Sequence, residues 1–284
     1  MSTRSSQKVF TGPFLIREDI FYHQDTNELV TGAFESFHEN GQLKVRGTLK
    51  DGKLDGPSEE YYETINKYGY KVDKEKRGQL KFKGTYIDGK LDGPSEEYYD
   101  PAERARAEIF LVRALPSQAY KEKPAQLKFR GAYIDGKLDG PSETFHDNGQ
   151  LKFKGTYIDG KLDGPSKTFH ENGQLKSEQN YIDGKLNGPS KTFHENGQLH
   201  FLTKYKDGKE DGCFESFHQN GQLSFKFTYI KGKRDGPCAG FYYNGQLEFK
   251  GACKDGNKEG FYEHFDQNGN LTKTETYRNG VRVE

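Results

Sequence analysis

The sequence predicts an all-β protein, an elongated stack of antiparallel β-hairpins that repeat every 24 residues. One column of glycines recurs at this interval without exception from Gly136 to Gly280, and most of its members follow an aspartate. A second column with the same spacing runs from Gly149 to Gly269 and always follows an asparagine. Asp-Gly and Asn-Gly supply the positive φ that tight hairpin turns require, so each unit holds two strands and two turns.

The composition fits such a stack better than it fits disorder or two ordinary domains. Only 31% of the 284 residues are apolar, which is low for a conventional core. However, 43 Lys and Arg balance 43 Asp and Glu, and aromatic residues reach 14%, whereas disordered chains are typically charge-imbalanced and poor in aromatics. Stacked repeats need less apolar content because each buries only a few large side chains against its neighbours.

The repeating unit is most regular in residues 131–154 and 155–178, and about ten units fill the chain. It reads G-x-Y-I-D-G-K-L-D-G-P-S-x-T-F-H-x-N-G-Q-L-x-F-K. A two-residue Asp-Gly loop after Ile158 pairs this residue with Lys161 and places Tyr157 opposite Leu162. We therefore predict a two-residue turn at this end of the unit.

The other turn is predicted to be longer. A two-residue Asn-Gly loop would set Phe169 opposite Lys176, whereas a three-residue loop over 171–173 with a bulge pairs Phe169 with Leu175. The apolar pair favours the three-residue loop.

One face of each hairpin is predicted to be apolar. Phe153, Gly155 and Tyr157 alternate with more polar residues, which is typical of a half-buried strand. In this register Gly155 falls opposite Gly164, and Pro165 marks a bend or bulge because it cannot donate to a central ladder. We expect the bend to recur in every unit and to shape a trough with aromatic inner walls.

The G-x-Y-x-D-G-K-x-D-G core with its F-H-x-N-G-Q-L arm resembles the MORN repeat, in the bacterial variant found in YwqK-like antitoxin proteins, over residues 20–284. The resemblance implies a hairpin stack used for interaction rather than catalysis. Bacterial relatives are labelled antitoxin or immunity proteins, and eukaryotic relatives are linked to scaffolding and membrane association. The chain departs from the pattern by two insertions.

These insertions add 13 and 23 residues to successive units, at about residues 64–78 and 101–125. Both replace the Asn-Gly turn, so two adjacent hairpin tips are extended on one edge. In the second, Asp100-Pro101 predicts a helix start, and residues 102–115 predict a short helix with an apolar stripe.

Insertions in repeat arrays often lie on the binding face. We predict that the two tips contact a protein partner, although tolerated loops with a helix that covers exposed sheet explain them equally well. The candidate partner-binding residues are aromatic, basic and apolar side chains of the insertions, namely Tyr68, Tyr70, Arg104, Arg106, Ile109, Phe110 and Arg113.

No pattern of residues predicts a metal, cofactor or catalytic site. A histidine column at 24-residue spacing places imidazoles about 9–10 Å apart, too far to share one zinc ion, and predicts a solvated surface ladder. The aspartates lack calcium-loop spacing, and no phosphate loop or nucleophile motif is present. The three cysteines are odd in number and lack C-x-x-C spacing, so we expect reduced thiols.

The sequence thus predicts one repeat array over residues 20–284, with residues 1–19 as an N-terminal cap or tail. We expect a non-catalytic, cytoplasmic, protein-binding scaffold without cofactors, and under the resemblance an antitoxin that neutralises a toxin. The alternatives are a structural or membrane-peripheral scaffold and, more remotely, a sugar-binding repeat. Charges compensated within each unit argue against nucleic acid and disfavour membrane contact. The sequence does not define the oligomeric state.

Overall fold

A computed structural model describes residues 9–64, 78–101 and 125–283, and the elements whose bounds lie in these ranges are all β-strands. The predicted all-β stack of hairpins with a 24-residue period is confirmed. The helix predicted at 102–115 lies outside the described residues. The described part of the chain contains no helix of the length and apolarity needed to cross a membrane.

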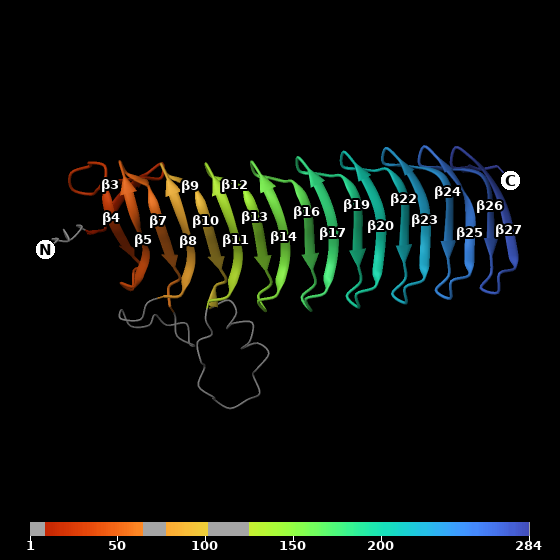
Figure 1. Ribbon diagram of the computed structural model, residues 1–284, viewed down its shortest axis with the longest axis horizontal. Coiled ribbons are helices and arrows are strands. Elements are labelled where there is room, and N and C mark those ends of the chain that lie inside the picture. Colours follow the sequence, from red (N-terminus) through yellow and green to blue (C-terminus); the bar gives the residue numbers. More distant parts are fainter. Residues whose placement is uncertain (1–8, 65–77, 102–124, 284) are drawn as a thin grey trace, which may run out of the picture. The chain divides into compact units, whose positions relative to one another are not determined.

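The chain divides into two compact units, Met1–Gln150 and Leu151–Glu284. The strands of the first unit are β1 (Val9–Thr11), β2 (Phe14–Arg17), β3 (Ile20–His23), β4 (Gly32–Phe37), β5 (Leu43–Lys50), β6 (Lys53–Leu54), β7 (Gly56–Tyr61), β8 (Leu80–Ile87), β9 (Lys90–Leu91), β10 (Gly93–Tyr98), β11 (Leu127–Ile134), β12 (Lys137–Leu138) and β13 (Gly140–Phe145). Antiparallel pairing joins β4 to β5 and continues to β13, β2 and β3 form a separate hairpin, and β1 pairs in parallel with β4 (Figure 1).

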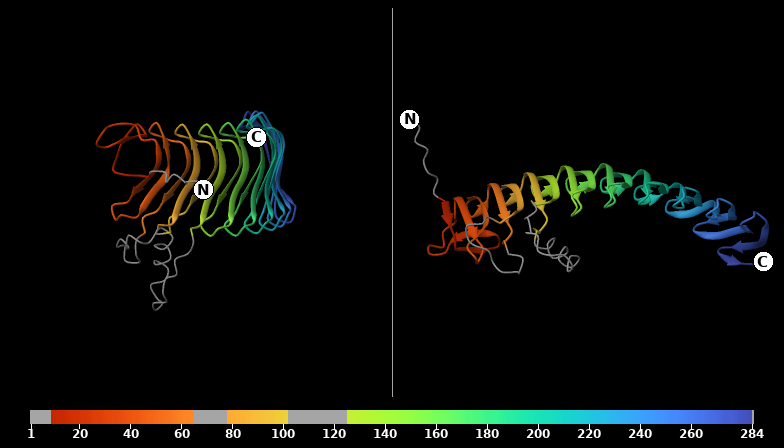
Figure 2. Two further views of the ribbon diagram at one scale, coloured as in Figure 1. Left: turned by 60° about the vertical axis from the view of Figure 1, so that its left-hand side comes forward. Right: turned by 90° about the horizontal axis from the view of Figure 1, so that it is seen from below.

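The second unit repeats one hairpin plan from end to end. Its strands are β14 (Leu151–Ile158), β15 (Lys161–Leu162), β16 (Gly164–Phe169), β17 (Leu175–Ile182), β18 (Lys185–Leu186), β19 (Gly188–Phe193), β20 (Leu199–Lys206), β21 (Lys209–Glu210), β22 (Gly212–Phe217), β23 (Leu223–Ile230), β24 (Lys233–Phe241), β25 (Leu247–Lys254), β26 (Asn257–Phe265), β27 (Leu271–Arg278) and β28 (Val281–Arg282). The strands of the second unit form a single layer (Figure 2), whereas in the first unit the β2–β3 hairpin packs Phe14 and Phe21 onto Phe34 of the main sheet.

Both predicted turn geometries are confirmed. Tyr157 pairs with Leu162 across an Asp-Gly turn whose two residues have φ of 49° and 80°, the positive values of a type I′ turn. At the other end Phe169 pairs with Leu175 after a bulge, and the Gly173 amide donates to the His170 carbonyl at 2.9 Å. The loop over 171–173 therefore has three residues.

The predicted Gly155–Gly164 pair is wrong. Phe153 pairs with Thr168 in the long part of the hairpin, a register two residues away from that of the Asp-Gly turn. Gly164, with φ of 95°, and Pro165 instead pair with the next strand, β17. Since proline has no N–H to donate, the ladder to β14 breaks there and resumes two residues later.

Burial on the apolar face is thinner than predicted. Each of the two compact units has one small buried hydrophobic cluster. It consists of Val30, Phe34 and Leu49 in the first compact unit, and of Phe227, Cys238, Cys253 and Tyr262 in the second. Elsewhere the Phe, Tyr and Leu columns are half-buried, and the serine after each proline, such as Ser95 or Ser166, is buried instead. Away from the β2–β3 hairpin, the single layer has no second sheet to cover its large side chains, so the small residues in the bend are the buried ones.

The D-G-K-x-D sequence ties each hairpin to the next along the Asp-Gly edge. The Gly184 amide donates to the Leu162 carbonyl at 2.8 Å. The Asp183 amide donates to the Asp163 carboxylate at 2.9 Å, and the Asp183 carboxylate pairs with the Lys161 ammonium at 2.6 Å. The ammonium lowers the pKa of Asp183. Both aspartates of the motif therefore have structural roles.

Candidate binding surfaces

The two insertions leave the sheet where other units close their Asn-Gly tips, as predicted. The Tyr62 amide donates to the Gln79 carbonyl and the Tyr99 amide to the Gln126 carbonyl, each at 2.9 Å. His170 and Gln174 close an ordinary tip with the same bond. The described chain therefore departs and returns at adjacent hairpins on one edge of the first unit (Figure 1).

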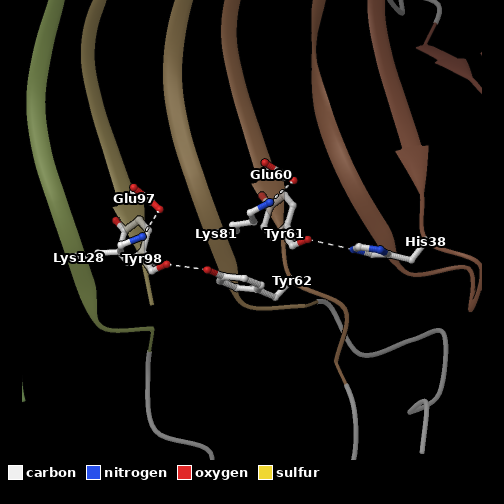
Figure 3. Close-up of polar contacts among 8 residues, drawn as sticks. All are labelled: His38, Glu60, Tyr61, Tyr62, Lys81, Glu97, Tyr98 and Lys128. Carbon is white, nitrogen blue, oxygen red and sulfur yellow. Dashed lines mark hydrogen bonds and ion pairs between the residues drawn. The ribbon is translucent and has the colours of Figure 1, made fainter. Parts of the chain in front are cut away.

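The roots of the insertions, Tyr61 and Tyr62 for the first and Tyr98 and Tyr99 for the second, are the residues where the chain leaves the sheet. They are joined to each other and to the preceding hairpin (Figure 3). The Tyr62 hydroxyl donates to the Tyr98 carbonyl at 2.8 Å, and the His38 Nε2 bonds to the Tyr61 carbonyl at 3.0 Å. Because a carbonyl only accepts, Nε2 of His38 carries the proton. The Tyr99 hydroxyl repeats the contact onto Phe145 at 2.7 Å.

Ion pairs lie beside these roots. Lys81 pairs with Glu60 at 2.7 Å, and Lys128 pairs with Glu97 at the same distance (Figure 3). The Lys81 ammonium also lies 6.0 Å from the centre of the Tyr62 ring. All four charged side chains are 31–47% exposed, so water screens both ion pairs and each contributes little to the stability of the fold.

The predicted partner-binding side chains themselves lie outside the described residues. They are Tyr68, Tyr70, Arg104, Arg106, Ile109, Phe110 and Arg113. The structure thus defines the platform from which both insertions depart and leaves the role of these residues a prediction.

The histidine column is not the solvated surface ladder that the spacing predicts. Its described members are half-buried, and Nε2 of His38, His170, His194 and His218 donates to the carbonyl of the next hairpin tip. The bonds join His170 to Phe193, His194 to Phe217 and His218 to Phe241 at 2.9–3.1 Å. Tyr242 makes the equivalent contact through its hydroxyl. Sequence spacing could not show this role, because the acceptor is a backbone atom.

Several strands of the second unit depart from the Phe-x-Gly pattern of the regular repeat. The glycine alone is replaced in β20 (Thr203) and β23 (Phe227), and both positions differ in β17 and β27. Where β14 has Phe153 and Gly155, β17 has Ser177 and Gln179. The Phe153 ring lies so close to Gly155 that a Cβ there would approach Cζ of the ring at 2.7 Å. Both positions therefore differ in β17, and comparison of residues 177–180 with 153–156 reveals the difference.

An open hollow lies beside this departure on the apolar face. It has a volume of about 600 Å³ and is lined on one side by Thr168, Ser177, Gln179 and Thr192. A second hollow of about 410 Å³ adjoins it. Both are lined by His194, His200, Phe201 and Gln219.

The rings on the wall of these hollows are in contact. The centre of the His200 ring lies 4.1 Å from that of His194 and 3.6 Å from that of Phe201. Burial, and to a lesser degree the charge of His194, lowers the pKa of His200, so its imidazole is neutral near pH 7.

The three cysteines are free thiols, as predicted. Cys213 is exposed, whereas Cys238 and Cys253 are buried with sulfur atoms 4.0 Å apart, each in contact with the Tyr262 hydroxyl. Burial raises the pKa of Cys238 and of Tyr262. Among the described residues, no three His, Cys, Asp or Glu side chains are grouped as metal ligands.

Comparison with known proteins identifies the repeat. A model of the MORN repeat variant matches six segments, residues 30–51, 138–159, 162–183, 186–207, 210–231 and 258–279. No curated protein matches the chain. One similar solved chain comes from the crystal structure of TcdB2-TccC3, at 12% identity and a TM-score of 0.17.

That likeness covers 93% of this chain but only 16% of the other, and its low TM-score carries no argument about fold or function. The six matched copies, and the hairpins that they form, are what define this protein. These six segments match the MORN repeat variant, and they lie in the stack of hairpins.

Proposed function

We propose that this protein is a non-catalytic scaffold that binds a protein partner through its two insertions, and that the partner is a toxin that it neutralises. The observation that supports the proposal is the common origin of the insertions, at adjacent tips joined by the Tyr62–Tyr98 hydrogen bond. A rigid platform that presents two segments together lowers the ordering cost of binding. The antitoxin role rests on the family resemblance.

The charge of the insertions indicates the kind of surface that they would contact. Residues 65–77 contain five basic and two acidic side chains, and residues 102–124 contain five and three. The whole chain has a formal net charge of zero. The insertions therefore concentrate positive charge, and we expect an acidic partner surface whose association slows at higher salt.

The decisive experiment replaces both insertions, residues 64–78 and 102–125, with plain Asn-Gly turns. Affinity purification from the native cell should recover one protein in stoichiometric amount with the wild-type chain and not with the double replacement. Far-UV circular dichroism should remain that of a β protein. A variant whose insertions keep their length but consist of Gly and Ser separates the role of the side chains from that of loop length.

Equal recovery of the partner by the wild-type chain and by the double replacement would contradict binding by the insertions. The toxin part is tested separately, by expressing the captured partner alone and together with the wild-type chain. We expect growth arrest that co-expression relieves. A partner that is harmless when expressed alone excludes neutralisation while leaving the scaffold role intact.

A further inference from the structure

We infer that the hollow beside β17 binds a neutral saccharide. The hollow exists because β17 lacks an aromatic ring that the regular units have. In the other regular units a phenylalanine ring covers a glycine, as Phe129 covers Gly131 and Phe153 covers Gly155. In β17 the ring is absent, and the Gln179 side chain takes part of the space, donating to Ser190 at 3.2 Å and accepting from the Tyr181 hydroxyl at 3.2 Å. An aromatic part of the apolar face is thereby replaced by hydroxyl and amide groups.

Hydroxyl-bearing side chains line one wall of the hollow. Strand pairing places Ser177 opposite Thr168 on one side and opposite Thr192 on the other. The Thr168 and Ser177 hydroxyls lie 2.6 Å apart. The Thr192 Oγ1 is buried and has no hydrogen-bond partner among the described residues. Because the Thr192 Oγ1 is buried, the groups of this wall that a ligand contacts are those of Thr168, Ser177 and Gln179, which line the hollow.

Aromatic rings form another wall of the hollow. His194, His200 and Phe201 form a continuous run of half-buried rings on the side shared by both hollows. Aromatic rings offer a flat apolar surface, and the adjoining hydroxyls and amides offer directional hydrogen bonds. A pyranose ring has the matching structure, with C–H groups on its faces and hydroxyl groups around its edge.

The lining of the two hollows has little net charge. The two hollows have one basic and one acidic side chain in their lining, Lys176 and Glu195, and both are exposed at the rim. The His200 imidazole inside is kept neutral by its lowered pKa. No charge of one sign predominates, which disfavours a phosphorylated or acidic ligand and favours an uncharged one. The combined volume, 600 and 410 Å³, accommodates a short oligosaccharide.

The experiment uses the full chain and a panel of neutral oligosaccharides: cello-, malto-, laminari- and chito-oligosaccharides. Saturation-transfer NMR detects binding, and isothermal titration calorimetry measures its affinity. The test variant is S177F/Q179G, which introduces the phenylalanine and glycine of the preceding unit, Phe153 and Gly155, and so fills the hollow with packing that the fold already uses. The matched control is N180T, a change to the residue of other units on the opposite face of the same strand.

We expect at least one member of the panel to bind the wild-type chain and the N180T control alike. Its affinity for S177F/Q179G should fall by more than about tenfold, the change that a loss of about 1.4 kcal/mol of binding free energy produces. Absence of binding to the wild-type chain across the panel overturns the inference, and so does equal binding to S177F/Q179G. The insertions are intact in all these variants, so the outcome is independent of the proposed protein-binding function.

Discussion

At the level of single residues, the polar columns of the repeat serve two hairpins at once. The Asn172 Oδ1 accepts from the Gln174 amide and shapes its own turn, while its Nδ2 donates to the Glu195 carbonyl of the next tip at 2.9 Å. Asn196 and Asn220 repeat both contacts. Side chains that look like surface decoration in the sequence therefore hold neighbouring hairpins together.

The histidine column gives a prediction at this scale. Replacing His38 by alanine removes its bond to the Tyr61 carbonyl and should lower the free energy of unfolding by about 1 kcal/mol. Replacement by tyrosine should cost less, because Tyr62, Tyr99 and Tyr242 reach the equivalent carbonyls from the same position. Urea denaturation measures both variants, and equal destabilisation by the two would contradict the assigned role.

At the level of the element, phenylalanine packs closely on glycine in the regular units such as β14, whereas β20 keeps Phe201 beside Thr203. In β14 a Cβ at position 155 would meet both the Phe153 ring, at 2.7 Å, and the Leu162 side chain, at 3.0 Å. In β17 the residue at the phenylalanine position is serine, and the larger Gln179 is accommodated in place of glycine.

This packing predicts strong coupling between the two positions. Gly155→Ala should destabilise the protein by about 1–3 kcal/mol through overpacking. In the background of Phe153→Ser the same change should cost much less, because the ring that the new methyl group meets is gone. A double-mutant cycle from chemical denaturation measures the coupling. Additive free energies would show that the ring and the glycine are independent.

The last hairpin gives a pH prediction. The carboxylate of Glu275 is buried in β27 and bonds to the Lys273 ammonium at 2.7 Å. Chiefly through this bond, the pKa of Glu275 falls from 4.5 to about 2. A lowered pKa in the folded state stabilises it fully above the ordinary value, and this stabilisation is lost as the pH falls from about 4.5 to about 2.

Glu275→Gln should therefore be less stable than the wild-type chain near pH 7, and the difference should shrink toward about pH 2. Urea midpoints of both proteins across this range give the comparison, and subtraction removes the contribution of the other carboxylates. A difference that stays constant with pH would show that the ionised carboxylate contributes nothing.

At the level of the whole molecule, charge compensation is built from cross-strand pairs. In the first unit Arg46 pairs with Glu59, Lys83 with Glu96, and Arg130 with Glu143, each across two neighbouring strands. In the second unit the same row contains Lys226–Glu215 and Lys250–Glu263. These pairs compensate charge locally along the strands, and each pair is at least partly exposed and weak by itself. The net charge of zero also includes the excess positive charge of the insertions.

Repetition also predicts how the molecule tolerates deletion. Removing residues 199–222 deletes one whole unit, so the following strand keeps its direction and its hydrogen-bonding partners. We expect a folded β protein that is less stable, because repeat stabilities and interfaces add along the stack. Removing residues 199–210 deletes a half unit and reverses the required strand direction. Circular dichroism and urea denaturation distinguish the two, and loss of folding in both would contradict additive stability.

Much of the fold could be predicted from the sequence because its signals are local. Asp-Gly and Asn-Gly define their own turns, and the pairing of Phe169 with Leu175 follows from turn length and polarity within one hairpin. The Gly155–Gly164 pairing failed because the sequence does not reveal which neighbouring strand takes the hydrogen bonds that Pro165 cannot make. The hollow was missed since its walls come from several strands.

The sequence by itself therefore determined the repeat, its period, the two turn types, the location of the insertions and the neutral charge. These follow from backbone preferences and spacing along one unit. The tertiary structure alone decided how neighbouring hairpins are joined. The histidine and asparagine side chains bond to carbonyls 23 residues away, and Ser177, His194 and Phe201 line one hollow. Such contacts depend on how hairpins align side by side, which spacing within a single hairpin does not specify.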